Sequence, residues 1–561
     1  MFRWLSAVGA RARRAVGAAV GKGNRAAWGR RVSRTPLFPA VFGALVTGLG
    51  IAFVAYAFLR WITPVDSSRE AAEIDVTRLA LTVVAGVGGV VALVIAYRRQ
   101  RDLEQSRFVE RFGAAAAQLG ATDVAVRIAG VYAMAGVADE SDGQRRQQCI
   151  DVLCGYLRLP YTPDLGGNHQ TKRVQKRPIG ADDGEDENHF EYRQNDREVR
   201  ATIVRVIADH LRADAEYNWS ASNFDFRTAH LENADFSSST FAGVARFGGA
   251  TFTGATTFNF VTFDGNADFH SATFSGATEF RLASFSDEAD FREATFTGAA
   301  SFAKARFARV VSFDQCVFAS TAMFDGACFT SIVRFRRATF TGVARFRAAF
   351  QGVAWFSGAT FKASAAFAEA TFHNAARFNE ITIAGRADFT EVTFTGAAFF
   401  TDAIITGVAS FRPAAFGADA TFRGATFHNV ADFSTATVTG DADFTETTFG
   451  GDAGFSEATF IGDTAFHGAE FGKETRFRGC RFGGAAEFHS ATFGTGAVFE
   501  DVGFGSRADF TGVDFGTATV VFNNPRRWGP PPPVFDWTDD GTGKPPNVEP
   551  AVWPPAVAGG S

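Results

Sequence analysis

Residues 267–296 read ADFHSATFSGATEFRLASFSDEADFREATF, and this stretch decides the fold. Phenylalanine recurs in it at 269, 274, 280, 285, 291 and 296, so the steps alternate between five and six residues and define an 11-residue unit. A small residue, usually Ala, stands two positions before almost every Phe. A step of two places both side chains on one side of an extended segment, whereas a helical seam needs steps of three and four. Each half-unit is therefore predicted to be a short extended piece followed by a corner.

The same rhythm continues from about residue 225 to about residue 520 and accounts for the 63 Phe and 58 Gly of the 561-residue chain. Gly often follows Phe at the second position, as at Gly254, Gly276 and Gly298, which suits a turn. Stacked corners predict a solenoid with an interior of Phe and Ala. Phe346 and Phe350 are closer together than the rhythm allows, which predicts a kink or an irregular coil near 346–356.

These Phe-centred units resemble the pentapeptide-repeat family, in an alternating five/six-residue variant of the membrane-anchored bacterial type. The resemblance implies an all-β right-handed quadrilateral β-helix, with Phe252 and Ala250 pointing inward and Thr251 outward. The additional residue in every second face implies a coil of about 22 residues with a bulge at a corner. Ile383, Ile405 and Val438 replace Phe within the array. The solenoid is expected over residues 216–522. The Pro-rich residues 523–561 are expected to form a flexible extended tail, and the less favoured alternatives are a docked cap or a ligand for a partner groove.

Two uncharged apolar runs precede the repeats, Leu37–Leu59 and Leu79–Tyr97, and each is long enough to cross a hydrocarbon core of about 30 Å. Residues 1–36 are basic without an acid, and arginines follow the second run at 98, 99 and 101. The connecting residues 60–78 instead carry acids at 66, 70, 73 and 75. Positive flanks stay on the cytoplasmic side. The sequence therefore predicts a basic cytoplasmic arm (1–36), transmembrane helices at 37–59 and 79–97, a short external loop (60–78), and both termini in the cytoplasm at the inner membrane.

Residues 98–215 are predicted to be a helical cytoplasmic segment. Apolar side chains recur at helical spacing in four stripes, one of which runs from Val124 to Ala135 behind a capping residue at Thr122 or Asp123. Residues 160–195 interrupt the stripes with a basic cluster followed by an acidic one. With so little to bury, this stretch is predicted to be a mobile loop.

No catalytic, cofactor-binding or metal site is predicted. The five cysteines lack CxxC spacing and a paired His motif, and there is no GxSxG, HExxH or phosphate-binding Gly loop. His467 and His489 stand two repeat units apart and could stack on neighbouring coils, but two ligands fall short of a metal site. The residue directly after a repeat Phe is expected to face solvent, and His or Arg occupies it at His270, His373, His428, His467, His489, Arg281, Arg336, Arg347, Arg412, Arg423 and Arg478.

The sequence therefore favours a non-enzymatic, membrane-tethered scaffold or protein-interaction module, whose partners are membrane lipid through the two transmembrane helices and an unknown protein on the β-helix surface. The alternative is a DNA-mimicking regulator of a topoisomerase or other DNA-binding protein, because some members of the family resemble a duplex. The net charge of −5 and the modest excess of acids in the array do not favour a DNA-mimicking function. They do not favour a nucleic-acid partner either. A third alternative, a β-helical carbohydrate enzyme, would cluster its carboxylates on one face, and the acids of this array are scattered. Acids such as Asp441, Glu446 and Asp452 become more frequent late in the array, which predicts a rod with an electric dipole.

Overall fold

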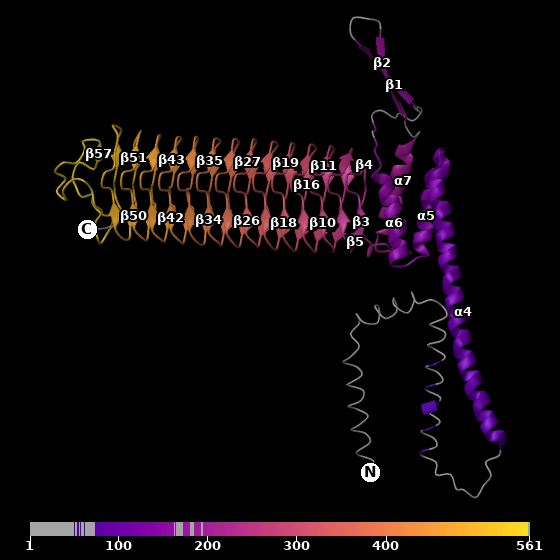
Figure 1. Ribbon diagram of the computed structural model, residues 1–561. Coiled ribbons are helices and arrows are strands. Elements are labelled where there is room, and N and C mark those ends of the chain that lie inside the picture. The colour runs from indigo at the N-terminus through magenta and orange to yellow at the C-terminus, as the bar shows by residue number, and fades with distance from the viewer. Residues whose placement is uncertain are drawn as a thin grey trace. The chain divides into compact units, whose positions relative to one another are not determined.

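The computed structural model describes residues 46, 50, 53–54, 57, 61, 73–161, 163, 172–179, 184–191 and 195–558. The chain divides into two compact units, residues 1–111 and residues 112–561. Helix α4 (Glu73–Leu119) lies mostly in the first unit. The second unit contains three helices, a two-stranded hairpin and a long solenoid of short strands (Figure 1).

The predicted transmembrane helices are not supported. Within the described ranges, no helix is both long and apolar enough to cross a membrane. The predicted span at 37–59 lies almost entirely outside those ranges, and the span at 79–97 falls within α4. Membrane insertion therefore stays a prediction.

Four parallel sheets form the walls of the solenoid, and the chain visits them in the same order in every coil (Figure 1). We call their outer surfaces faces I to IV. Face II runs from β4 (His230–Glu232) and β7 (Thr251–Thr253) to β51 (Thr492–Phe493), face III from β8 (Thr256–Thr257) to β55 (Val520–Val521) and β57 (Val548–Glu549), and face IV from β5 (Thr240–Phe241) to β53 (Gly503–Phe504) and β56 (Arg527–Trp528). Face I comprises β3 (Phe224–Asp225), β6 (Ala245–Arg246), β10 (Ala267–Asp268), β14 (Ala289–Asp290), β18 (Val311–Ser312), β22 (Val333–Arg334), β26 (Ala354–Trp355), β30 (Ala376–Arg377), β34 (Ala398–Phe399), β38 (Ala420–Thr421), β42 (Ala442–Asp443), β46 (Thr464–Ala465), β50 (Ala486–Glu487) and β54 (Ala508–Asp509).

The register between coils confirms the predicted repeat length. Ala267 pairs in parallel with Ala245 on one side and with Ala289 on the other, so each step along face I spans two repeat units. The sheets of faces I, III and IV each contain 14 strands and that of face II contains 13, in agreement with the predicted β-helix.

Stacked phenylalanine rings fill the interior. The ring of Phe269 lies 4.7 Å from that of Phe247 and 4.8 Å from that of Phe291, nearly parallel to both, and it meets the ring of Phe258 edge to face at 5.6 Å. Ile383, Ile405 and Val438 occupy Phe positions in the same register and are equally buried. Fully buried rings at these separations combine apolar burial with favourable aromatic geometry, so this core drives the fold.

The two kinds of corner explain the alternation of five and six residues. The five-residue step from Phe269 to Phe274 passes through Ser271, whose φ of 53° is left-handed. The six-residue step onward passes through Gly276, where a Cβ would meet the carbonyl oxygen of Gly254 at 2.1 Å. The additional residue therefore bulges at this second corner, as predicted, and glycine allows the close approach of the coil beneath.

The predicted kink near 346–356 is wrong. Face I passes through this segment in register, with Ala354 paired to Val333 and Ala376, and the rings of Phe346 and Phe367 stack at 4.9 Å. The missing residue is the left-handed corner residue, because no residue between 337 and 358 has a positive φ. The corner shortens while both flanking strands keep their places, so this coil is shorter than its neighbours by a single residue and the stack does not bend.

A bundle of three helices caps the solenoid, and two of them pack against its first strands, β3 and β4. The helices are α5 (Val124–Asp139), which Asp123 caps as predicted, α6 (Gln144–Leu157) and α7 (Asp196–His210). A largely buried ion pair joins α5 to α7, with Arg127 Nη1 2.7 Å from Asp196 Oδ1. Arg158 joins the helices to β3 through an ion pair of 2.7 Å with Asp225. The predicted helical segment is thus an end cap, which repeat folds need to cover their terminal core.

The loop predicted at 160–195 contains an antiparallel hairpin, β1 (Lys172–Ile179) and β2 (Gly184–Glu191), so its prediction as a loop without strands is wrong. The basic cluster pairs with the acidic cluster across the two strands. Lys176, for example, lies opposite Glu187 and contacts it at 2.8 Å. Charge complementarity between strands supplies the stabilisation that apolar burial does not.

The tail is a docked cap instead of the flexible segment predicted at 523–561. Its strands β56 and β57 pair with the last strands of faces IV and III. The ring of Phe535 stacks on Phe510 at 4.8 Å, and Trp537 and Trp553 pack against Phe535 at 4.5 and 5.1 Å. These aromatic side chains cover the Phe ladders that would otherwise end in solvent.

Candidate interaction surface

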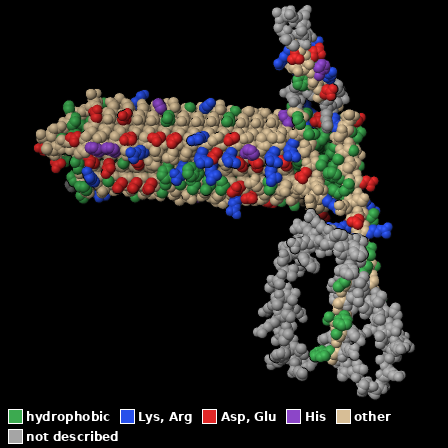
Figure 2. All heavy atoms as spheres, viewed as in Figure 1, with side chains coloured by type: hydrophobic (Ala, Val, Ile, Leu, Met, Phe, Trp, Pro, Cys, Tyr) green, Lys and Arg blue, Asp and Glu red, His purple; other side chains and the backbone are tan. Residues whose placement is uncertain are grey.

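Face I carries basic, aromatic and acidic side chains in succession along the solenoid, and its geometry follows from the strand pattern. The first residue of each face I strand is buried and the second points outward. We call the outward residues of successive face I strands the central column. In Figure 2, basic side chains gather over the half of the solenoid nearer β3, with acidic side chains among them and beyond them.

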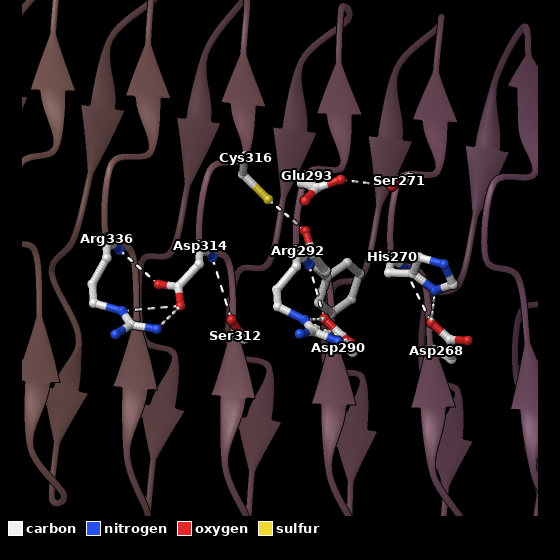
Figure 3. A network of polar contacts seen from close by, with 11 residues as sticks. Asp268, His270, Ser271, Asp290, Arg292, Glu293, Ser312, Asp314, Cys316 and Arg336 are labelled. Atoms are coloured by element: carbon white, nitrogen blue, oxygen red, sulfur yellow. Dashed lines mark hydrogen bonds and ion pairs between the residues drawn. The ribbon is translucent and has the colours of Figure 1, made fainter.

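A shallow charged groove occupies the first part of face I, between β6 and β22, with a volume of about 770 Å³. Its charges are largely paired, as Figure 3 shows. Arg292 contacts Asp290 of the same coil at 2.6 Å, and Arg336 contacts Asp314 of the preceding coil at 2.5 Å. The hydrogen bond that Arg336 donates to Asp314 raises the pKa of the guanidinium. Internal pairing leaves this groove little net charge to attract a ligand.

His270 lies in the same groove, with Nδ1 2.7 Å from Asp268 Oδ1 (Figure 3). Among the residues that the structure describes, no group of three or more His, Cys, Asp or Glu side chains is placed to hold a metal ion. His467 and His489 stack as predicted, with ring centroids 5.3 Å apart. The remaining predicted positions are exposed, but the structure divides them between the faces and does not bring them together: Arg336 and Arg423 on face I, Arg281, Arg347, Arg412 and Arg478 on face III, His428 on face II and His373 on face IV.

A second zone of face I, the cation–aromatic zone, consists of Arg334, Trp355, Arg377 and Phe399 on four consecutive strands. The guanidinium of Arg377 lies between two rings, 4.7 Å from the centroid of Trp355 and 5.1 Å from that of Phe399. Its Nε is buried without a hydrogen-bond partner in the structure. The rings hold the cation in place while its outer nitrogens stay free to bind an anion.

This zone is not among the features predicted from the sequence. The signal was present, because Trp355, Arg377 and Phe399 each immediately precede a buried Phe. Their alignment with Arg334 depends on the shortened coil, so a strictly constant period misplaces them.

The third zone is acidic and follows directly along the same face. Asp443 and Glu487 belong to the central column, and Asp419, Asp441 and Asp463 form a ladder beside it. Each ladder carboxylate accepts a hydrogen bond from the backbone amide one coil further on, at distances of 2.8–3.0 Å. The amides hold these carboxylates in one row along the face. Only some of the acids that the sequence places late in the array belong to this row.

The five cysteines are free, and all but Cys328 are buried. Burial raises the pKa of Cys149 to about 11 and that of Cys154 to about 12. Cys316 donates its Sγ–H to the carbonyl of Phe291 at 2.7 Å. These thiols fill core positions and are poor nucleophiles.

The described part of the second unit is thus a four-sided parallel β-solenoid with a helical cap at one end and the docked tail at the other. The family model for pentapeptide repeats (9 copies) matches residues 261–306, 291–339, 346–393, 389–437 and 433–481. These residues of the solenoid therefore consist of pentapeptide repeats. No curated protein and no solved structure matches the chain.

Proposed function

We propose that this protein is a non-enzymatic interaction scaffold that binds other proteins through face I. The observation that carries the proposal is the cation–aromatic zone, in which Arg377 lies between Trp355 and Phe399 on a rigid wall. Trp, aromatic and Arg side chains contribute most of the binding energy at protein interfaces. The solenoid holds them in register before binding, so little side-chain entropy is lost on association.

We further propose that the scaffold is tethered to the inner membrane with the solenoid in the cytoplasm. The support is the sequence of the first unit, with two uncharged runs at 37–59 and 79–97 and a strongly basic arm before them. A tether would hold the scaffold at the bilayer and raise the local concentration of whatever it binds.

Proximity labelling in intact cells, with the label fused after Ser561, tests both statements. We expect labelled cytoplasmic proteins and a chain that stays with the membrane after alkaline extraction. Labelling confined to external proteins, or release of the chain by alkali, would contradict the proposed tether.

The role of face I is tested by the double variant Trp355→Ser/Phe399→Ser. We expect it to lose the proteins that the unaltered chain labels most strongly. The matched control is Val317→Ser/Ile404→Ser, which removes two exposed apolar side chains from face II. An unchanged set of labelled proteins in the face I variant would refute the proposed binding surface.

A further inference from the structure

We propose that a second copy of this chain binds face I, so that two solenoids pack face to face and antiparallel around a two-fold axis between β34 and β38. The proposal deepens the interaction function assigned to face I by naming one partner, and it rests on that function only for the choice of face.

The register of the sheet fixes which residues would meet. A two-fold axis that runs along the strands, midway between β34 and β38, exchanges strands at equal distances on either side of it while preserving the position along each strand. It therefore brings β30 opposite β42 and β22 opposite β50 of the second copy. The central column then places Arg377 opposite Asp443, and Arg334 opposite Glu487.

The shapes are also complementary in this register. The large ring of Trp355 on β26 faces the small Ala465 on β46. Phe399 faces Thr421 across the axis itself. No like-charged residues of the central column meet between β22 and β50, and every contact occurs twice, as a two-fold interface requires.

The charges that would pair between copies are those that the chain leaves unpaired. Within the described structure, Arg334, Arg377, Asp443 and Glu487 form no ion pair. Two arginines that line the neighbouring groove, Arg292 and Arg336, are instead neutralised by acids of their own chain, Asp290 and Asp314. Face I carries unpaired cations in one half and unpaired anions in the other. Two copies therefore match in charge only when their solenoids run in opposite directions.

Size and rim contacts indicate a reversible dimer. The strands from β22 to β50 span roughly 35 Å at about 4.8 Å per coil, which makes a long but narrow contact. Glu380 and Glu446, exposed corner residues, approach at the edge of the contact and repel. We expect a dissociation constant of roughly micromolar order at physiological salt, rising with ionic strength.

Sedimentation velocity of the purified full chain, in mild detergent throughout, tests the proposal. The variants are Arg377→Glu and Asp443→Arg. Each alone sets like charges opposite one another at both symmetry-related contacts, and we expect a dissociation constant about a hundredfold higher or more. Mixed in equal amounts, the two variants restore both contacts as opposite charges, and we expect the dimer to return as a heterodimer.

The control is Arg306→Glu, which makes the same charge change at an exposed residue of face IV and should leave dimerisation unchanged. A monomeric unaltered chain at up to about a hundred times the expected constant would overturn the proposal. So would dimers that persist in both single variants, or a mixture that stays monomeric. Sedimentation measures only this protein with itself, so its outcome does not depend on the labelling experiment. Labelling of other proteins can succeed if the chain is a monomer, and it can fail if the chain is a dimer.

Discussion

Two adjacent phenylalanines on β34 and its following corner offer a sharp test of what stabilises the solenoid. Phe400 is buried, with rings stacked at 4.8 Å on Phe378 and 4.9 Å on Phe422, and two further rings edge to face at 5.3 and 5.5 Å. Phe399 points outward and contacts Arg377. Truncation of a fully buried Phe costs about 3–5 kcal/mol, and the loss of these ring contacts places Phe400→Ala in the upper half of that range. We expect Phe399→Ala to cost less than about 1 kcal/mol, because it opens no cavity.

Native-state amide exchange followed by mass spectrometry measures this difference locally, which matters because a long repeat array does not unfold as one cooperative unit. We expect exchange in the coils that contain Phe400 and its stacked neighbours to accelerate roughly a thousandfold in Phe400→Ala, with the effect fading over the adjacent coils. Phe399→Ala should exchange like the unaltered chain. Equal acceleration in the two variants would refute the conclusion that the inward ring ladder is the source of stability.

Three further predictions concern the corners, the cap and the thiols. Gly276→Ala should lower the denaturation midpoint, because the new Cβ meets backbone that cannot move away. Gly503→Ala should leave the midpoint unchanged, because the nearest atom to its new Cβ, Arg527 Cβ, is 3.9 Å away. Equal midpoints in the two variants would contradict the close packing of coils. The hydrogen bond from Arg227 holds the pKa of Asp225 below its ordinary 3.8, so its stabilisation is present above that value and is lost as the pH falls through the lower folded-state value. Acid titration of the exchange rates in the cap measures this, and an Asp225→Asn variant that keeps the same acid midpoint would contradict it. A maleimide at mildly alkaline pH should modify Cys328 before Cys154, whose pKa burial raises to about 12; simultaneous modification in native protein would contradict the described core.

Much of the fold could be predicted because one physical requirement repeats. A small residue two before each Phe defines an extended half-unit, and dozens of copies leave no helical alternative. The coil of two repeat units, the corner bulge and the stacked pair His467 and His489 all follow from that spacing, and all three are confirmed.

The errors share a cause as well. The kink at 346–356 was inferred from the short spacing between Phe346 and Phe350, whereas the chain removes a corner residue and keeps every strand. The hairpin of β1 and β2 was not predicted because its strands bury little apolar surface and pair through charges, as Lys176 does with Glu187. The flexible tail was favoured over a docked cap because its composition does not show that Phe535 stacks on the end of the Phe ladder. In each case local spacing or composition does not show which residues pair in the folded chain.

The sequence by itself determined the period, the inward and outward alternation, and hence the β-solenoid, because a strand of two residues has only two sides. Only the tertiary structure decided which outward residues become neighbours. The step from Arg334 to Trp355 is one residue shorter than the two equal steps on to Arg377 and Phe399, so Arg334 aligns with the other three because one corner is shortened. Which outward residues align on neighbouring coils depends on the length of every corner between them. Deletion of one corner residue changes the spacing of the aligned residues in the sequence and leaves the core unchanged.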